Sequence, residues 1–335
     1  MTINATAMGD GSIVLAAAAL WPKVRRWVLP LLGMAVLGLL ISHANKVDWA
    51  GAWAALKQYS PSLLLGVLAI ATVSHTLYGC FDLVGRHHTQ HHLPVWRTWA
   101  IAIASYALNL NLGSLVGGVA LRTRLYYQAG VKEFQIAQVI GLGLATNWMG
   151  YSLLAGSLFA AGLVSPPGQA NMSPATMRWL GVLLVLIAAV YVLACAIARG
   201  RQWTIRGRTL RLPTPQIALL QIGISALNWS LMGAMMYLLL GGQVPYGTTL
   251  CVLLAASIAG VVIPVPGGLG VLEAVYLALL SGSVPQGRLM GAILAYRALY
   301  YMVPLAGGVM LYAFLEHYAS THPASPAKGR DVAPA

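Results

Sequence analysis

Residues 257–280 read SIAGVVIPVPGGLGVLEAVYLALL, an apolar stretch that one unbroken helix cannot cross. Two prolines and three glycines interrupt it, at Pro264, Pro266, Gly267, Gly268 and Gly270. The prolines remove backbone donors and clash with the preceding turn, and the glycines let the chain turn sharply. Glu273 follows, the only carboxylate between Glu133 and Glu316. Because irregular backbone and carboxylates at membrane depth must face protein, water or a ligand, we expect a re-entrant helical hairpin over residues 248–280.

The composition indicates an integral membrane protein. Of 335 residues, 59% are hydrophobic and only 8% are charged, whereas soluble domains carry about 25% charged residues. The net charge of +13 is expected to come from basic cytoplasmic loops that lie beside anionic headgroups. We predict no nucleic-acid partner. The three cysteines lie singly in apolar segments, without metal or redox spacing. We therefore predict membrane phospholipid as a partner and no cofactor.

A second irregular segment covers residues 98–130, TWAIAIASYALNLNLGSLVGGVALRTRLYYQAG. Two asparagines and three glycines interrupt it, at Asn109, Asn111, Gly113, Gly117 and Gly118. Arg122 and Arg124 follow, where a new helix is expected to begin. The pattern predicts a second re-entrant hairpin.

Six further stretches are apolar and close to the length of about 20 residues that a membrane-crossing helix needs. They cover residues 27–43, 62–83, 134–163, 177–198, 216–240 and 288–315. Six crossings place both termini on one side, which would hold fifteen Lys and Arg residues against four on the other. The positive-inside rule makes that side the cytoplasm. The predicted domains are a cytoplasmic segment 1–22, a transmembrane domain 23–318 and a disordered cytoplasmic tail 319–335.

The two hairpins suggest an internal repeat. An offset of 150 residues carries Gly117–Gly118 onto Gly267–Gly268 and Asn147 onto Arg297. Each half, 23–164 and 175–318, then has three spans and one hairpin, and an odd number of crossings inverts the second copy. The predicted fold is an all-α membrane protein built as an inverted repeat, with its site where the broken elements meet at the midplane. The alternative is that two glycine-rich segments resemble one another by chance.

The charged residues in these segments are the candidate substrate-binding residues. Arg122 and Arg124 could hold a phosphate, because guanidinium pairs with it bidentately; alternatively, they anchor the hairpin at the cytoplasmic surface. Glu273 and Arg297 could form a structural ion pair. In the functional alternative, Arg297 contacts a headgroup and Glu273 is its switch partner, or Glu273 carries a proton.

Three other polar features remain. Asp82 has three possible partners, Arg122, Arg124 and Arg86, or it is solvated. Asn147 is a further candidate, although asparagines in membrane helices, such as Asn147 and Asn228, more often join helices than bind ligands. Four histidines have helical spacing, at His87, His88, His91 and His92, but no acid or cysteine lies nearby, so no metal site is predicted. The chain has no nucleophile elbow, HExxH or P-loop motif, and we predict that it is not an enzyme.

Two motifs carry a family resemblance. VVIPVPGGLGVLEA at 261–274 and GGVALRTRLY at 117–126 resemble hairpins of the transmembrane, flippase-like region of lysylphosphatidylglycerol synthases. With TNWMGY at 146–151 and AYRALYY at 295–301, the chain is more similar to the stand-alone, synthase-free inner-membrane members of YbhN type. The resemblance implies a bacterial inner-membrane protein that moves phospholipid between leaflets. It places the family's hairpin arginine at Arg122 and its hairpin glutamate at Glu273, and it implies no aminoacyl-transfer domain.

Three functions are consistent with these features. The first is translocation of an anionic phospholipid, such as phosphatidylglycerol or cardiolipin, through a cleft between the hairpins. The second is proton-coupled transport of a soluble anion. The third is a non-transporting scaffold or lipid-binding partner of a phospholipid-synthesis enzyme. The sequence predicts neither the substrate nor the oligomeric state.

Overall fold

The computed structural model describes residues 53–54, 57–163, 173–198, 201–205, 208–262 and 265–322. These residues belong to one compact unit, Trp49–Ala335. The predicted N-terminal segment 1–22, the first predicted span 27–43, Pro264 and the predicted tail beyond residue 322 lie outside the described residues.

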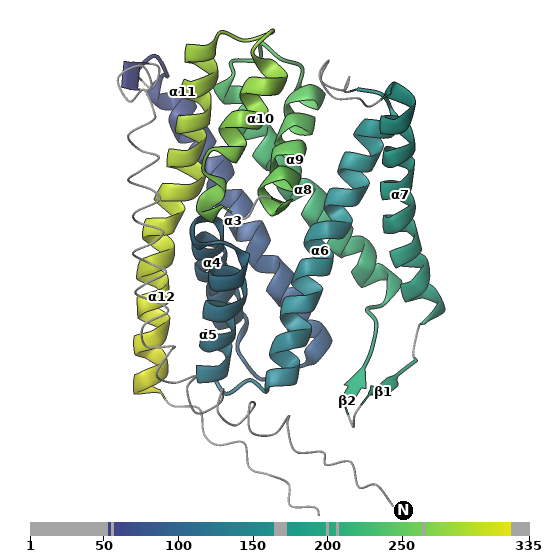
Figure 1. Ribbon diagram of the computed structural model, residues 1–335. Coiled ribbons are helices and arrows are strands. Elements are labelled where there is room, and N and C mark those ends of the chain that lie inside the picture. The colour runs from purple at the N-terminus through teal and green to yellow at the C-terminus, as the bar shows by residue number, and fades with distance from the viewer. Residues whose placement is uncertain are drawn as a thin grey trace, which may run out of the picture. The chain divides into compact units, whose positions relative to one another are not determined.

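The described part of the chain is mainly helical, with one short β-hairpin (Figure 1). The long helices are α3 (Pro61–Thr89), α6 (Glu133–Ala160), α7 (Pro174–Ile197), α8 (Pro215–Leu239) and a continuous run of α11 (Gln286–Tyr296), η3 (Arg297–Met302) and α12 (Val303–Thr321). The shorter ones are α4 (Val95–Leu112), η1 (Ser114–Leu121), α5 (Arg122–Gln128), α9 (Tyr246–Val262), η2 (Pro266–Gly268) and α10 (Val271–Leu280). Strand β1 (Trp203–Ile205) pairs antiparallel with β2 (Arg208–Leu210) between α7 and α8.

Within the described residues, four helices are long and apolar enough to cross a membrane: α3, α7, α8 and the continuous helix Gln286–Thr321. They correspond to four of the six predicted spans. Three of them begin with a proline that follows a capping Ser or Thr, at Ser60, Ser173 and Thr214. Each capping side chain accepts a backbone N–H from the first turn, which satisfies a donor that the helix itself leaves free.

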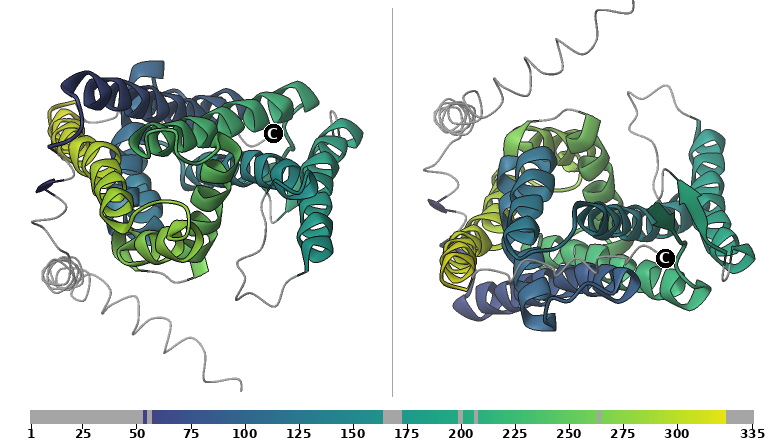
Figure 2. Two further views of the ribbon diagram at one scale, coloured as in Figure 1. Left: turned by 90° about the horizontal axis from the view of Figure 1, so that it is seen from above. Right: turned by 90° about the horizontal axis from the view of Figure 1, so that it is seen from below.

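Helix α6 corresponds to the predicted span 134–163. It has 28 residues, but it is not among the four apolar helices. Its polar side chains, including Asn147, lower its hydropathy. Much of its surface is covered instead by protein, since it packs against α3, α7 and α8. Both views of Figure 2 place α7 at the edge, with α6 beside it.

The chain reverses after α4, within the first segment of predicted breaks. Gly113 adopts a φ of 87°, and η1 then packs back along α4. The approach is so close at Gly117 that an added Cβ would lie 2.3 Å from the backbone nitrogen of Asn109. Glycine is therefore required there by the spacing of the two backbones rather than by its own torsion angles. We call α4, η1 and α5 the first hairpin.

The chain reverses again between α9 and α10, which pack on one another. Here the glycines are needed for their torsion angles: φ is 65° at Gly267, 57° at Gly268 and 80° at Gly270. Pro266 begins the single 3₁₀ turn η2 between them. We call α9, η2 and α10 the second hairpin.

The tips of the two hairpins meet. Helix α4 contacts η2, and a Cβ added to Gly267 would lie 3.7 Å from the carbonyl oxygen of Asn111. Asn111 also donates from Nδ2 to the carbonyl oxygens of Ala107, at 2.9 Å, and Tyr301, at 3.3 Å. In Figure 1 the first hairpin lies below this contact and the second lies above it. The tips and η3 therefore form one junction.

Gly117→Ala is expected to destabilise the protein strongly, because backbone atoms of α4 occupy the space that the new methyl group needs. Gly141→Ala in α6 is the matched control, since nothing lies within 4 Å of its added Cβ. That change should be neutral or stabilising by up to about 1 kcal/mol. Thermal unfolding in detergent compares the two variants, and equal midpoints would contradict the packing of η1 on α4.

Candidate functional site

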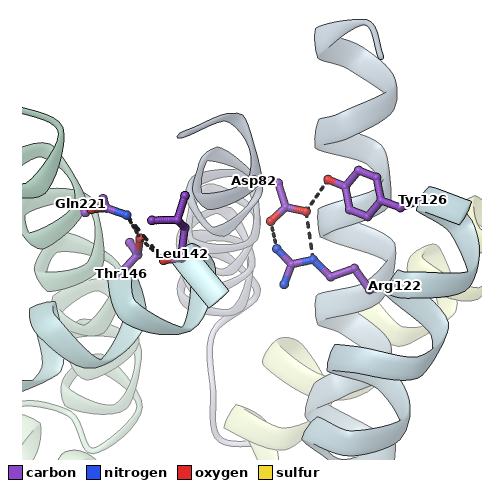
Figure 3. Close-up of polar contacts among 6 residues, drawn as sticks. All are labelled: Asp82, Arg122, Tyr126, Leu142, Thr146 and Gln221. Atoms are coloured by element: carbon purple, nitrogen blue, oxygen red, sulfur yellow. Dashed lines mark hydrogen bonds and ion pairs between the residues drawn. The ribbon is translucent and has the colours of Figure 1, made fainter. Parts of the chain in front are cut away.

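The first charged pair joins Asp82 of α3 to Arg122 of α5 (Figure 3). Arg122 donates from Nε to Asp82 Oδ2 at 3.0 Å, and its Nη2 pairs with Oδ1. The Tyr126 hydroxyl donates to the same Oδ2 at 2.6 Å. Asp82 and Tyr126 are fully buried, and Arg122 is 4% exposed. A carboxylate so buried needs a cation and hydrogen-bond donors, and it has both.

Local sequence explains this arrangement. Arg122 and Tyr126 are four residues apart on α5, so they lie on one face of it and both reach Asp82 of α3. Gly143 of α6 lies behind the guanidinium, where an added Cβ would come within 3.2 Å of Arg122 Nη2. Tyr126 was not among the predicted site residues, because a tyrosine in an apolar helix resembles an ordinary core residue.

Arg124 does not join the first pair. Two residues after Arg122, it faces another direction, and its Nε lies 2.7 Å from Glu316 Oε1 on α12. Both side chains of this pair are about one-third exposed or more. Glu316 lines a pocket between the ends of α5 and α12, together with Gln128 and Ser320. Of the three predicted partners of Asp82, the structure selects Arg122, and it separates the two hairpin arginines.

The second charged pair joins Glu273 of α10 to Arg297 of η3. Arg297 donates from Nε to Oε1 at 2.6 Å and from Nη2 to Oε2 at 3.0 Å. It also donates from Nη1 to the Gly267 carbonyl and from Nη2 to the Gly268 carbonyl, both at 2.8 Å. Arg297 is only 9% exposed. One guanidinium therefore holds the acid and the tip of the second hairpin together.

Glu273 has a second task at the same tip. Its Oε2 accepts the Gly270 backbone N–H at 2.9 Å, which caps the first turn of α10. The ring of Tyr301 lies 5.6 Å from the Arg297 guanidinium carbon, within cation–π range. Pairing of Glu273 with Arg297 was one of the sequence alternatives, and the structure brings these two residues together.

A hydrogen-bonded network lies at the contact of α3, α4, α8 and η3. The Ser74 hydroxyl donates to Asn228 Oδ1 at 2.7 Å and lies 3.0 Å from the Tyr300 hydroxyl. The Tyr300 hydroxyl lies 2.9 Å from that of Tyr106. We call these four residues the tyrosine network. The sequence pattern predicted that Asn228 joins helices. It gave no indication of Ser74, Tyr106 or Tyr300, although Tyr300 lies three residues after Arg297.

Asn147 lies apart from both charged pairs. It is half-buried on α6, and its backbone carbonyl accepts the Ser225 hydroxyl of α8 at 3.0 Å. One turn away, Gln221 of α8 donates to Thr146 Oγ1 at 2.7 Å and also contacts the Leu142 carbonyl (Figure 3). These contacts join α6 to α8.

Of the four histidines, His87 and His88 lie in the last turn of α3, and His91 and His92 follow it in the loop before α4. The described residues contain no group of three or more His, Cys, Asp or Glu side chains that could hold a metal ion. His88 Nε2 bonds to the Arg211 carbonyl, and His92 Nε2 to that of Ala129. His91 is buried, and this burial together with the charge of Arg86 lowers its pKa to about 4. His88 therefore connects the end of α3 to the segment before α8, and His92 connects the loop after α3 to the end of α5.

The comparisons with known proteins cover most of the chain. Residues 26–308 match the family described as the lysylphosphatidylglycerol synthase TM region. Over 258 residues the chain is 42% identical to the inner membrane protein YbhN of Escherichia coli strain K12, covering 77% of this chain and 81% of that protein. It is also 27% identical over 268 residues to the uncharacterized protein slr0712 of a Synechocystis strain, covering 77% and 82% of the two chains.

Proposed function

The chain belongs to the flippase-like family of the lysylphosphatidylglycerol synthase transmembrane region, and we propose that it translocates an anionic phospholipid between the leaflets of a bacterial inner membrane. The proposed substrates are lipids of the phosphatidylglycerol or cardiolipin class. The observation that carries this proposal is that each hairpin takes part in a guanidinium–carboxylate pair largely shielded from solvent, Asp82 with Arg122 at the first hairpin and Glu273 with Arg297 at the tip of the second.

The proposed membrane arrangement is an inverted repeat with two re-entrant hairpins and cytoplasmic termini. The 150-residue offset carries α4 onto residues 245–262, against 246–262 for α9, and η1 with α5 onto 264–278, against 266–280 for η2 with α10. The offset also carries Gly117–Gly118 of η1 onto Gly267–Gly268 of η2, although the first hairpin reverses at Gly113. This agreement of element bounds supports the repeat, and broken elements that meet at midplane are where transporters of this plan bind substrate.

In the proposed cycle a lipid phosphate competes with a carboxylate for each arginine. Phosphate and carboxylate both accept paired N–H bonds, so either can occupy the same guanidinium. At the first pair, Arg122 would turn to the headgroup while Tyr126 continues to hold Asp82. The acyl chains would remain in the lipid while the headgroup passes along the junction.

At the second pair, exchange of a carboxylate for a phosphate would also affect the backbone of the hairpin tip. Arg297 uses its donors on Glu273 and on two glycine carbonyls. It cannot take a phosphate without releasing some of these groups, so capture of a headgroup would loosen the tip of the second hairpin. Binding and opening are then the same event. Glu273 accepts N–H groups at both oxygens, which suits a switch partner better than a proton carrier.

Exchange of fluorescent phosphatidylglycerol between leaflets of proteoliposomes tests the proposal. The wild-type protein should accelerate exchange over protein-free vesicles, and Arg122→Gln should abolish most of the acceleration. Arg124→Gln is the matched control, because Arg124 lies on the same helix in an exposed pair. A wild-type rate equal to that of protein-free vesicles would refute translocation. A current driven by a soluble anion would favour the soluble-anion transporter instead.

A further inference from the structure

Arg97, in the first turn of α4, is a buried arginine without an acidic partner. It is 9% exposed, and the two other buried arginines of the described residues are Arg122 and Arg297. Each of those two pairs with a carboxylate, whereas Arg97 takes part in no ion pair within the described part of the chain. A buried charge is costly unless an opposite charge or hydrogen bonds compensate it. The position therefore favours a ligand that supplies a negative charge.

The carboxylates of the described residues are all committed elsewhere or exposed. Asp82, Glu273 and Glu316 are each paired with another arginine. Glu133 is exposed in the first turn of α6, and it pairs with no arginine of the described residues. The counter-charge for Arg97 therefore does not come from this part of the chain.

The donors of the Arg97 guanidinium are also unused. Nε is buried and has no hydrogen-bond partner, and neither Nη group makes a hydrogen bond within the described residues. The Nη groups, unlike Nε, are not fully buried, so they are the donors that a ligand can reach. Arg97 does contact the ring of Tyr318 on α12, which lies 5.1 Å from the guanidinium carbon, within cation–π range. That contact positions the guanidinium without using any of its N–H groups.

The carbonyl groups near the end of α12 already have donors. The Ser320 hydroxyl donates to the carbonyl of His317, and the Thr321 hydroxyl donates to the carbonyls of His317 and Tyr318. The backbone N–H of His322 also donates to the Tyr318 carbonyl, at 2.9 Å. Helix α12 therefore contributes an aromatic ring to the surroundings of Arg97, and not a counter-charge.

The guanidinium lies where the start of α4 meets the end of α12. The two helices pack along one another (Figure 1), with Gly308 beside Ala107 and Tyr318 beside Arg97. Trp96, which is 45% exposed, meets the Tyr318 ring edge-on at a centroid distance of 5.5 Å. Tryptophan and tyrosine are enriched at the headgroup level of membranes, where lipid phosphates also lie. The aromatic pair therefore indicates that Arg97 is at the depth of the headgroups.

The start of α4 adds to the attraction for an anion. Its N-cap residue is Pro94, and no side chain caps the first turn. The N–H groups of that turn lack an intrahelical acceptor, and they carry the positive end of the helix dipole. Helical side chains lean toward the N-terminus of their helix, so Arg97 extends toward the same end. Backbone and side chain thus favour a negative group at the start of α4.

We propose that Arg97 is the basic residue of a phosphate-binding site at the membrane surface, formed with Tyr318 and the start of α4. The phosphate belongs to a lipid headgroup or is free in solution, and in both cases the two Nη groups donate to its oxygens. At about 1.5 Å per residue, Asn111 at the junction lies about 20 Å further along α4. The site is therefore separate from the junction and does not rest on the proposed translocation.

Hydrogen exchange of the purified protein in detergent, with and without dioctanoyl phosphatidylglycerol, tests the site. The lipid should slow exchange several-fold at residues 95–97, because its phosphate covers and accepts the free N–H groups of the first turn of α4. The effect should disappear in Arg97→Gln and persist in Arg178→Gln. Arg178 is the matched control, because it also lies near the start of a helix beside a tryptophan, Trp179, but is exposed. Equal protection in Arg97→Gln and the wild type would overturn the proposal.

Two further ligands identify the source of the phosphate, and they need only the wild-type protein if Arg97→Gln does not fold. Dioctanoylglycerol has the same chains without a phosphate and should give no protection; protection equal to that of the phospholipid would overturn the proposal. Protection by inorganic phosphate would show that the site accepts a free anion, whereas protection by the phospholipid alone would assign it to a headgroup. Protection by neither phosphate compound would also overturn the proposal. None of these results decides translocation, which leaflet exchange tests separately.

Discussion

Asp82→Asn is expected to destabilise the protein by about 3–5 kcal/mol, the cost of leaving a buried charge without its partner. The change removes the negative charge that faces Arg122, and the guanidinium is 4% exposed, so water cannot replace the carboxylate. The asparagine keeps a carbonyl oxygen for the Tyr126 hydroxyl, so the loss reports mainly on the charge. Denaturant unfolding of the purified protein in detergent measures the effect.

Two further variants test whether the loss of stability comes from the unpaired buried charge. Asp82→Asn with Arg122→Gln removes both charges and should recover part of the lost stability, because no unpaired charge then remains. Glu316→Gln breaks the pair with Arg124, whose side chains are 31% and 40% exposed, and should cost less than about 1 kcal/mol. If Asp82→Asn costs no more than Glu316→Gln, the first pair does not stabilise the fold.

The long helices were largely predictable, because three of them start at a capping Ser or Thr followed by proline. Helix α8, at Pro215–Leu239, lies within one residue of the predicted span 216–240, since a Ser/Thr-Pro cap starts it and a glycine pair follows it. The reversals at Gly113 and at Gly267–Gly270 were predictable for a similar reason, because glycine takes the positive φ at both places. At Gly117 the backbone of α4 leaves no room for a larger residue.

The partners of the charged residues were only partly predictable. Sequence spacing left Asp82 with three possible cations, because the choice depends on how α5 is rotated relative to α3. That rotation follows from where η1 ends, and η1 is an eight-residue π-helical segment that no sequence pattern had indicated. The tyrosine network was missed for another reason. Its hydroxyl groups are supplied by helices far apart in the chain, and each residue alone looks like part of the core.

Asn147 shows where the repeat misleads. The 150-residue offset places it opposite Arg297, yet Asn147 joins α6 to α8 through its backbone, whereas Arg297 holds the second hairpin through its side chain. In the proposed repeat, corresponding positions would share backbone geometry more readily than chemistry, because packing fixes the first and a ligand or partner fixes the second. The charges of the two proposed halves lie at different positions, Asp82 with Arg122 and Glu273 with Arg297.

Arg297→Lys is expected to abolish most of the proposed translocation and to open the tip of the second hairpin, although it keeps the positive charge. Lysine is a point charge with a single nitrogen, whereas the guanidinium reaches both oxygens of Glu273 and the carbonyls of Gly267 and Gly268 from three nitrogens. At least one of these groups must lose its partner in the variant. Hydrogen exchange should therefore speed up at residues 267–270, and leaflet exchange of phosphatidylglycerol should fall towards the rate of protein-free vesicles.

Arg288→Lys is the matched control, since Arg288 lies on the same continuous helix at an exposed position. It should change neither hydrogen exchange at the tip nor the translocation rate. If Arg297→Lys behaved like this control, the charge alone would be sufficient and the fork-shaped contact with the glycine carbonyls would have no role. If it opened the tip without slowing translocation, the release of those carbonyls could not be the step that headgroup capture controls. The two measurements, hydrogen exchange at the tip and the translocation rate, separate the structural role of Arg297 from its proposed role in transport. Only the transport role requires both to change together.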